Sequence, residues 1–136
     1  MAGTVIVDCG FLVSLVRQRD AHRHWASTLA STHPPPWHTC DAALSETFYL
    51  TAPEARPALS ALLRRRAVLP SFDLGAELDP VLSLMDKYAD VPMSLADACL
   101  VRMSEILRHP VILTTDGDFR IYRRHGRRVV PCILPD

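Results

Sequence analysis

Short apolar runs and apolar stripes at helical spacing alternate along the chain, and this pattern predicts an α/β fold. The runs at residues 4–7, 37–39, 68–69 and 111–114 predict short buried strands, and residues 129–133 predict a last edge strand interrupted by a proline. Helical stripes lie between them, at residues 9–16, 22–32, 41–51, 54–66, 74–88 and 95–107. Strands that alternate with helices favour a layered sheet with helices on its faces.

Residues 91–119 form the most informative stretch, because they bring several carboxylates toward one place. Ser94 has the position of an N-cap, and Asp97 follows three residues later, where a capping-box acid stands. Pro110 ends this helix, the strand at residues 111–114 follows, and Asp116 and Asp118 come directly after it. A helix that begins at the carboxyl edge of a sheet returns the chain to the opposite edge, so the next strand runs back to where the helix began. Asp97 and Asp116 are therefore expected to converge.

Two further acids are predicted at the same edge of the sheet. Asp8 ends the first strand, and its alternative role is to cap the helix that begins near Cys9. Asp41 is predicted to cap the helix that follows the second strand, which places Glu46 in an early turn. The alternative for Glu46 is an acid favoured there by the helix dipole alone.

These gathered acids predict a divalent cation site. Unpaired carboxylates repel one another and raise one another's pKa values, and Mg²⁺ or Mn²⁺ relieves this repulsion through oxygen ligands. Matching His or Cys ligands are missing from the pattern, which argues against zinc. Such a site suits phosphodiester hydrolysis. Five arginines that follow the last acid could hold flanking phosphates, or could form a solvated basic surface: Arg120, Arg123, Arg124, Arg127 and Arg128.

The composition of the chain limits the class of protein and its location in the cell. A chain of 136 residues, of which 49% are hydrophobic, predicts a single domain spanning residues 1–136. Fifteen basic residues balance fifteen acidic ones, so no overall charge indicates nucleic acid or membrane as a partner. The four cysteines are widely spaced and predict reduced core thiols. No signal peptide or membrane span is evident, which predicts a cytoplasmic protein.

The first two helices carry more apolar residues than one sheet face is expected to cover, which predicts contact with another chain. The residues concerned are Phe11, Leu12, Leu15, Val16, Trp25 and Leu29.

The chain resembles the PIN domain family, and within it the small ribonucleases typified by VapC toxins. The resemblance covers nearly the whole chain and rests on the order of five segments: VIVDCGFLVSLV, LSETFYL, SLADACLV, LTTDGDF and VVPCILP. The family's metal-site acids match Asp8, Glu46, Asp97 and Asp116, and Asp118 matches a further acid. Thr114 matches the polar position before Asp116, but Gly10 stands where the family usually has Ser, Thr or Asn.

The resemblance implies a three-layer α/β/α sandwich with a central, mainly parallel five-stranded sheet. It also implies Mg²⁺- or Mn²⁺-dependent RNA cleavage, a homodimer, and inhibition by a cognate antitoxin that covers the metal-site edge. In this hypothesis Asp8, Asp97 and Asp116 hold metal, Glu46 and Asp118 bind a second ion or orient water, and the arginines contact RNA.

Two other function classes agree less well with the sequence. A catalytically inactive PIN-like module that binds RNA or protein has Gly10 as its only sequence support, and the intact set of acids counts against it. A phosphoryl-transfer enzyme or receiver domain would need a second Asp close after Asp8 or a late lysine. Lys87 is the only lysine and lies in a mid-chain helix, which disfavours this class.

Overall fold

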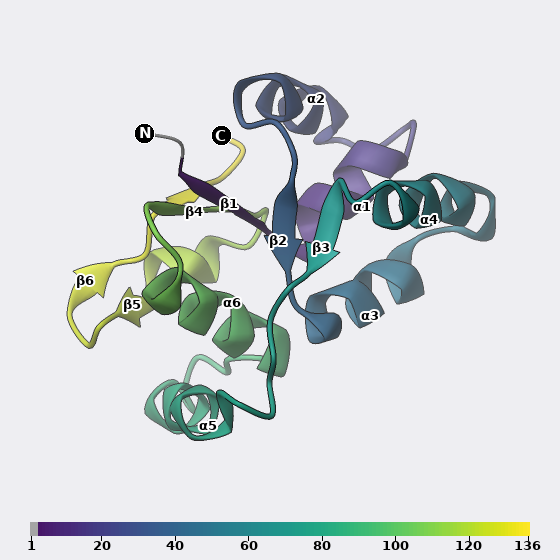
Figure 1. The fold of residues 1–136 in the computed structure, drawn as a ribbon. Helices are drawn as coiled ribbons and strands as arrows, with labels where there is room; N and C mark the ends of the chain where they lie inside the picture. Colours follow the sequence, from purple (N-terminus) through teal and green to yellow (C-terminus); the bar gives the residue numbers. More distant parts are fainter. Residues whose placement is uncertain (1–2) are drawn as a thin grey trace.

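A five-stranded sheet forms the centre of the computed structural model (Figure 1). Every pair of neighbouring strands in it is parallel. The structure describes residues 3–136. The strand order is β3-β2-β1-β4-β7. The strands are β1 (Thr4–Val7), β2 (Trp37–Thr39), β3 (Val68–Pro70), β4 (Pro110–Leu113) and β7 (Cys132–Ile133). The predicted parallel sheet is confirmed, with the first strand at its centre.

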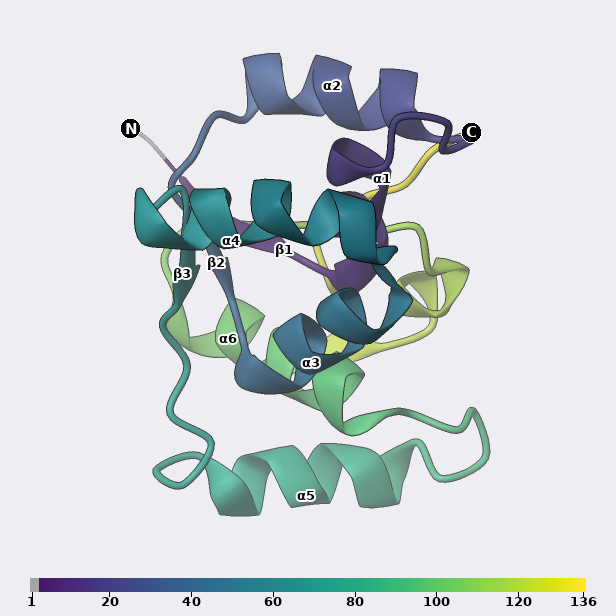
Figure 2. The same cartoon turned by 90° about the vertical axis from the view of Figure 1, so that its right-hand side faces the viewer.

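Helices cover both faces of this sheet (Figures 1 and 2). One face carries α1 (Cys9–Val16), α2 (Arg23–Thr32) and α4 (Arg56–Arg64), and the other carries α6 (Leu95–Ile106) with α5 (Leu78–Lys87) packed outside it. Helix α3 (Asp41–Leu50) contacts both α1 and α6. The short 3-10 helices η1 (Pro53–Ala55) and η2 (Gly117–Arg120) complete the helices of the α/β/α sandwich.

Side chains of the central strands alternate between two cores, as the period of two in a strand requires. Ile6 and Ile112 are buried against α6, whereas Val7 and Leu113 are buried against the layer of α1, α2 and α4. Because both faces are covered, β1 and β4 are held rigidly, and so are the residues that follow their carboxyl ends.

The apolar pattern assigns Leu78, Val81, Leu82 and Met85 of helix α5 to the core, and the structure confirms only part of this stripe. Val81 and Leu84 are buried, whereas Leu78 and Leu82, which the pattern assigned to the core, are each 45% exposed. The helix packs against α6 rather than against the sheet, so only a narrow stripe of it is covered. Met85, also predicted to face the core, is partly buried.

Two local predictions are corrected by the structure. Cys40, not Asp41, is the N-cap of α3, and its sulfur accepts a hydrogen bond from the Ala43 N–H at 3.4 Å. The predicted last strand is divided in two: Arg128–Val129 (β6) pairs antiparallel with Arg123–Arg124 (β5), and only β7 joins the main sheet. Gly126, with a φ of 81°, lies in the turn of this hairpin, where a glycine adopts the left-handed region without strain.

All four cysteines are free thiols, as predicted, but only Cys40 and Cys99 are buried, and Cys9 and Cys132 are half-buried. No helix within residues 3–136 is long and apolar enough to cross a membrane.

Half of the apolar residues that were predicted to meet another chain are buried within this one. Phe11, Leu12 and Leu29 lie in the core beside the sheet, so they are not free for a partner. Leu15, Val16 and Trp25 are partly buried against the same core. The sheet and α4 together cover more of these helices than a sheet face alone would.

Candidate functional site

The carboxyl ends of β1 and β4 lie side by side and carry the first part of the site. Val7 pairs with Leu113, and the Asp8 N–H donates to the Leu113 carbonyl at 3.0 Å. The hydroxyl of Thr114 donates to Asp8 Oδ2 at 2.8 Å and accepts from the Asp116 N–H at 3.0 Å. One buried threonine therefore connects the two acids that follow these neighbouring strands.

Asp8 also caps α1, as the sequence predicted. Its Oδ1 accepts from the Cys9 N–H at 2.7 Å, so both carboxylate oxygens have a donor. The side chain is 5% exposed. Asp8 therefore both caps α1 and belongs to the acidic group.

Helix α6 supplies Asp97 through the predicted capping box. Ser94 Oγ accepts from the Asp97 N–H at 3.0 Å, and Asp97 Oδ2 accepts from the Ser94 N–H at 3.4 Å. Asp97 Oδ2 also accepts from the Tyr122 hydroxyl at 2.9 Å. These bonds fix one oxygen of Asp97 and leave Oδ1 available to a ligand.

The two remaining acids lie nearer to solvent. Glu46, on α3, is exposed, and its Oε2 accepts a weak hydrogen bond from Cys9 Sγ at 3.5 Å. Asp118 is half-buried in η2, and its N–H donates to Asp116 Oδ1 at 2.9 Å. Glu46 therefore lies beside the start of α1, and Asp118 lies on the loop that carries Asp116.

Burial and mutual repulsion act on the inner acids. Burial raises the pKa of Asp8 to about 6; the hydrogen bonds from Thr114 and Cys9 oppose this rise, and the charges of Asp97 and Asp116 add to it. Burial also raises the pKa of Asp97, against the bond from Tyr122, and the charge of Asp116 raises it further. The charge of Asp116 therefore acts on both Asp8 and Asp97.

No basic side chain neutralises these acids within residues 3–136. The three ion pairs there involve Arg102 and Arg120 and none of Asp8, Asp97 or Asp116. Buried carboxylates without a counter-charge are costly, and their oxygen donors suit a hard divalent cation. The donor set is therefore of the type that takes a divalent metal ion. In the same part of the chain, however, no three His, Cys, Asp or Glu side chains stand close enough together to hold an ion without adjustment.

Tyr122 is a site residue that the sequence reading missed. Its ring is fully buried and makes edge contacts with Phe119 and Tyr88, with ring centroids 5.3 and 5.1 Å away. Burial and the bond to Asp97 raise the pKa of its hydroxyl, which therefore remains a donor. The only signal in the sequence was an aromatic residue three positions after Phe119, which gives no indication of a contact with α6.

The five arginines after Asp118 do not form one group. Arg123 donates to the carbonyls of Arg120, Ile121 and Tyr122, and Arg124 donates to the Ser104 carbonyl. These two are half-buried and hold the chain in place. The other three arginines are exposed: Arg120, Arg127 and Arg128. Arg120 Nη2 lies 3.7 Å from Asp136 Oδ1, and the other two lie on the hairpin.

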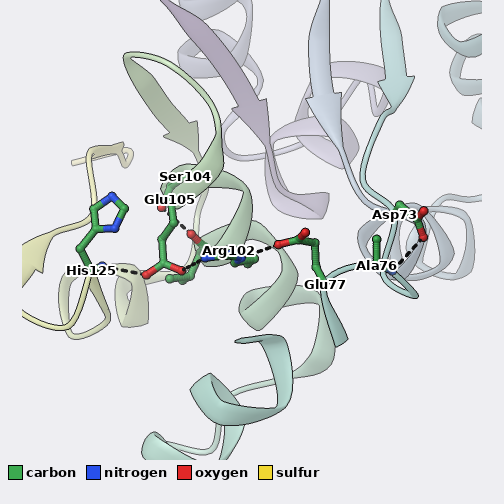
Figure 3. A network of polar contacts seen from close by, with 8 residues as sticks. Asp73, Ala76, Glu77, Arg102, Ser104, Glu105 and His125 are labelled. Carbon is green, nitrogen blue, oxygen red and sulfur yellow. Dashed lines mark hydrogen bonds and ion pairs between the residues drawn. The ribbon is translucent and has the colours of Figure 1, made fainter. Parts of the chain in front are cut away.

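The β5–β6 hairpin is fixed to the far end of α6. Glu105 accepts from the His125 N–H at 2.7 Å and from Arg102 at 3.1 Å, and Arg102 pairs with Glu77 at 2.7 Å (Figure 3). Glu105 lies eight residues after Asp97, or about 12 Å along the helix axis. The basic hairpin is therefore displaced from the acids along α6.

The family model for the PIN domain matches residues 5–124. The chain belongs to the PIN domain family. This match spans β1, the capping box of α6 and the loop of Asp116, the segments that bring the acids together. Comparison with curated proteins gives no match. PIN domains are in general nuclease domains that use divalent metals, so this PIN domain has a nuclease fold.

Proposed function

We propose that this PIN domain is an endoribonuclease that hydrolyses RNA phosphodiester bonds with the help of Mg²⁺ or Mn²⁺. One observation carries the proposal: Asp8, Asp97 and Asp116 come from three separate segments, lie close enough to raise pKa values, and have no ion-pair partner within residues 3–136. Gathering unpaired acids costs stability, and a bound cation offsets that cost.

Each acid has a distinct role in this proposal. Asp97 would hold the ion, and Tyr122 and Ser94 fix its Oδ2. Asp116 would also hold it, and the Asp118 N–H fixes its Oδ1. Asp8, which shares the Thr114 hydroxyl with the Asp116 N–H, would hold the ion with them and supply a buried negative charge. When bound, the ion would activate water and neutralise charge on the leaving oxygen. The more exposed Glu46 and Asp118 would orient water or hold a second ion.

RNA contacts are proposed at the exposed arginines. Arg120 follows directly on the loop of the acids, and Arg127 and Arg128 stand on the displaced hairpin. A separation of about 12 Å along α6 suits phosphates flanking the cleaved bond rather than the cleaved one. Arg123 and Arg124 would act mainly by holding this surface in shape.

The decisive experiment is cleavage of structured and unstructured RNAs with Mn²⁺, Mg²⁺ or EDTA by the wild type and Asp97→Asn. Asn can still accept the Tyr122 and capping hydrogen bonds while losing the charge that binds the ion. We expect an intact fold and a loss of activity of at least 10²-fold, on the order expected for a lost catalytic group. Asp90→Asn, on an exposed turn, is the matched control.

Two results would contradict the proposal. Cleavage that persists in EDTA would exclude the metal mechanism, and near wild-type cleavage by Asp97→Asn would reduce Asp97 to a capping residue. Wild-type protein that binds RNA without cleaving it in either ion would favour the inactive binding module instead.

We further propose that the protein is the toxin of a toxin–antitoxin pair and forms a homodimer. A groove of about 760 Å³ lies between the ends of α1 and α3 and the start of α4, and includes Val16, Tyr49 and Leu50. Tyr49 and Leu50 are 84% and 57% exposed, which suits contact with an apolar helix face. An Arg or Lys of the antitoxin would reach the acids. A monomer in light scattering at micromolar concentration, with no antitoxin-like reading frame beside the gene, would overturn this part.

A further inference from the structure

Gly10, the second residue of α1, is in close contact with Thr115, on the loop between Thr114 and Asp116. A Cβ at position 10 would overlap Thr115 Oγ1 and would lie 3.0 Å from its Cβ and 3.2 Å from its Cγ2. These distances are too short for a real side chain, so the hydroxyl of Thr115 fills the space that a side chain at position 10 would need. A side chain at position 10 would fit only if the Thr115 side chain moved, whereas glycine leaves this contact between α1 and the loop undisturbed.

Thr115 lies on the loop that joins β4 to Asp116, and its side chain contacts Gly10 near the start of α1. Its neighbours in the chain are Thr114, which is bonded to Asp8, and Asp116. Gly10, which Thr115 contacts, follows Asp8 by two residues in the chain. The Thr114 hydroxyl is fully buried and already both donates and accepts. The Thr115 side chain is half-buried, and its hydroxyl takes no part in the hydrogen bonds that link Asp8, Thr114, Asp116 and Asp118.

A neutral hydrogen-bond donor has a specific role at a site lined by carboxylates. An RNA phosphate that approaches Asp8 and Asp116 meets negative charge, and only the cation and nearby N–H or O–H donors can compensate for it. The inner acids are acceptors, and the Tyr122 hydroxyl is committed to Asp97. Thr115 presents an uncommitted O–H group from the same loop.

We propose that the Thr115 hydroxyl donates a hydrogen bond to a non-bridging oxygen of the phosphate being cleaved, and that Gly10 makes room for it. This inference rests on the proposed ribonuclease function and adds one substrate-contacting residue to it. The bond strengthens as negative charge develops on the phosphate, so its loss affects turnover more than RNA binding.

The test combines single and double variants. Thr115→Val keeps the shape of the side chain and removes the donor, and Thr115→Ser keeps the donor. Thr115→Gly removes the side chain, and Gly10→Ser added to Thr115→Gly returns a hydroxyl from α1 into the vacated space. Each protein is measured for kcat and KM on one RNA, for Mn²⁺ affinity by calorimetry, and for thermal stability.

We expect kcat of Thr115→Val to fall on the order of 10²-fold, the loss typical of a single donor to developing charge. Its Mn²⁺ affinity and melting temperature should match those of the wild type, and Thr115→Ser should stay near wild-type activity. The double variant should recover at least tenfold over Thr115→Gly.

Three results would overturn the inference. Wild-type turnover by Thr115→Val, or a parallel loss of Mn²⁺ affinity in that variant, would overturn it and leave the ribonuclease proposal standing. A wild-type protein without cleavage in either ion would overturn the ribonuclease proposal and this inference with it.

Discussion

Replacing Asp8 with Asn should remove the pH dependence of stability that this acid imposes on the metal-free protein. Burial raises its pKa from 3.8 to about 6. Each pKa unit corresponds to about 1.36 kcal/mol, so ionised Asp8 makes the folded state about 3 kcal/mol less favourable. Asn keeps an acceptor for the Cys9 N–H but gives up the bond from Thr114, worth about 1 kcal/mol. The net gain of Asp8→Asn above pH 7 is therefore about 2 kcal/mol.

The sign follows from the direction of the pKa change. The folded pKa lies above the unfolded one, so the unfolded chain releases its proton first as the pH rises. The wild type thus loses stability between about pH 4 and pH 6, and the loss is complete above that window. Asp8→Asn lacks this loss. It should be less stable than the wild type by about 1 kcal/mol near pH 4 and more stable by about 2 kcal/mol at pH 8.

Urea unfolding in EDTA at several pH values measures this difference, with Asp90→Asn as a control for the same chemical change on an exposed turn. Saturating Mn²⁺ at pH 8 should then stabilise the wild type by about 2.7 kcal/mol at a hundredfold excess over its Kd, and Asp8→Asn far less. Equal stability of the two proteins at pH 8, or a difference that does not change with pH, would show that Asp8 is not held as a buried, unpaired acid.

Two further predictions test parts of the structure that the sequence did not indicate. Tyr122→Phe should weaken Mn²⁺ binding about tenfold in calorimetry, since its hydroxyl orients the Asp97 carboxylate and losing such an outer partner of a ligand typically costs about tenfold or more. Tyr88→Phe, in the same aromatic cluster, should leave the affinity unchanged, and equal affinities for both variants would refute this. Leu84→Ala should lower the free energy of unfolding in urea by about 2 to 4 kcal/mol, and Leu82→Ala should lower it by less than about 1 kcal/mol, because Leu84 is buried and Leu82 is 45% exposed. The opposite order would mean that α5 is rotated about its axis.

Much of the site could be predicted because its signals are local. Ser94 and Asp97 form a capping box within one helical turn, and Asp8 caps the helix that follows its own strand. The position of Asp116 followed from the rule that a helix and the next parallel strand return the chain to the same edge. These features depend on residues close in sequence and on the regular geometry of α/β units.

Other features depended on contacts between distant segments. Tyr122 meets Asp97 across 25 residues, and nothing in the spacing of either residue indicates that contact. The interior roles of Arg123 and Arg124 depend on carbonyls left free by a turn and by the end of a helix. The apolar pattern of α5 assigned Leu82 to the core, and only the packing of this helix on α6 decided that Leu84 is buried instead.

By itself, the sequence predicted the alternation of strands and helices and placed Asp8, Asp97 and Asp116 at the ends of strands and helices, because caps and periodicity depend on neighbouring residues; the parallel five-stranded sheet followed from the family resemblance. The tertiary structure alone decided which oxygen of each acid is held and which is free, and how Thr115 fits over Gly10. The physical reason is that orientation within a site is set by side chains packed from other segments, at distances of a few ångströms that no local pattern specifies.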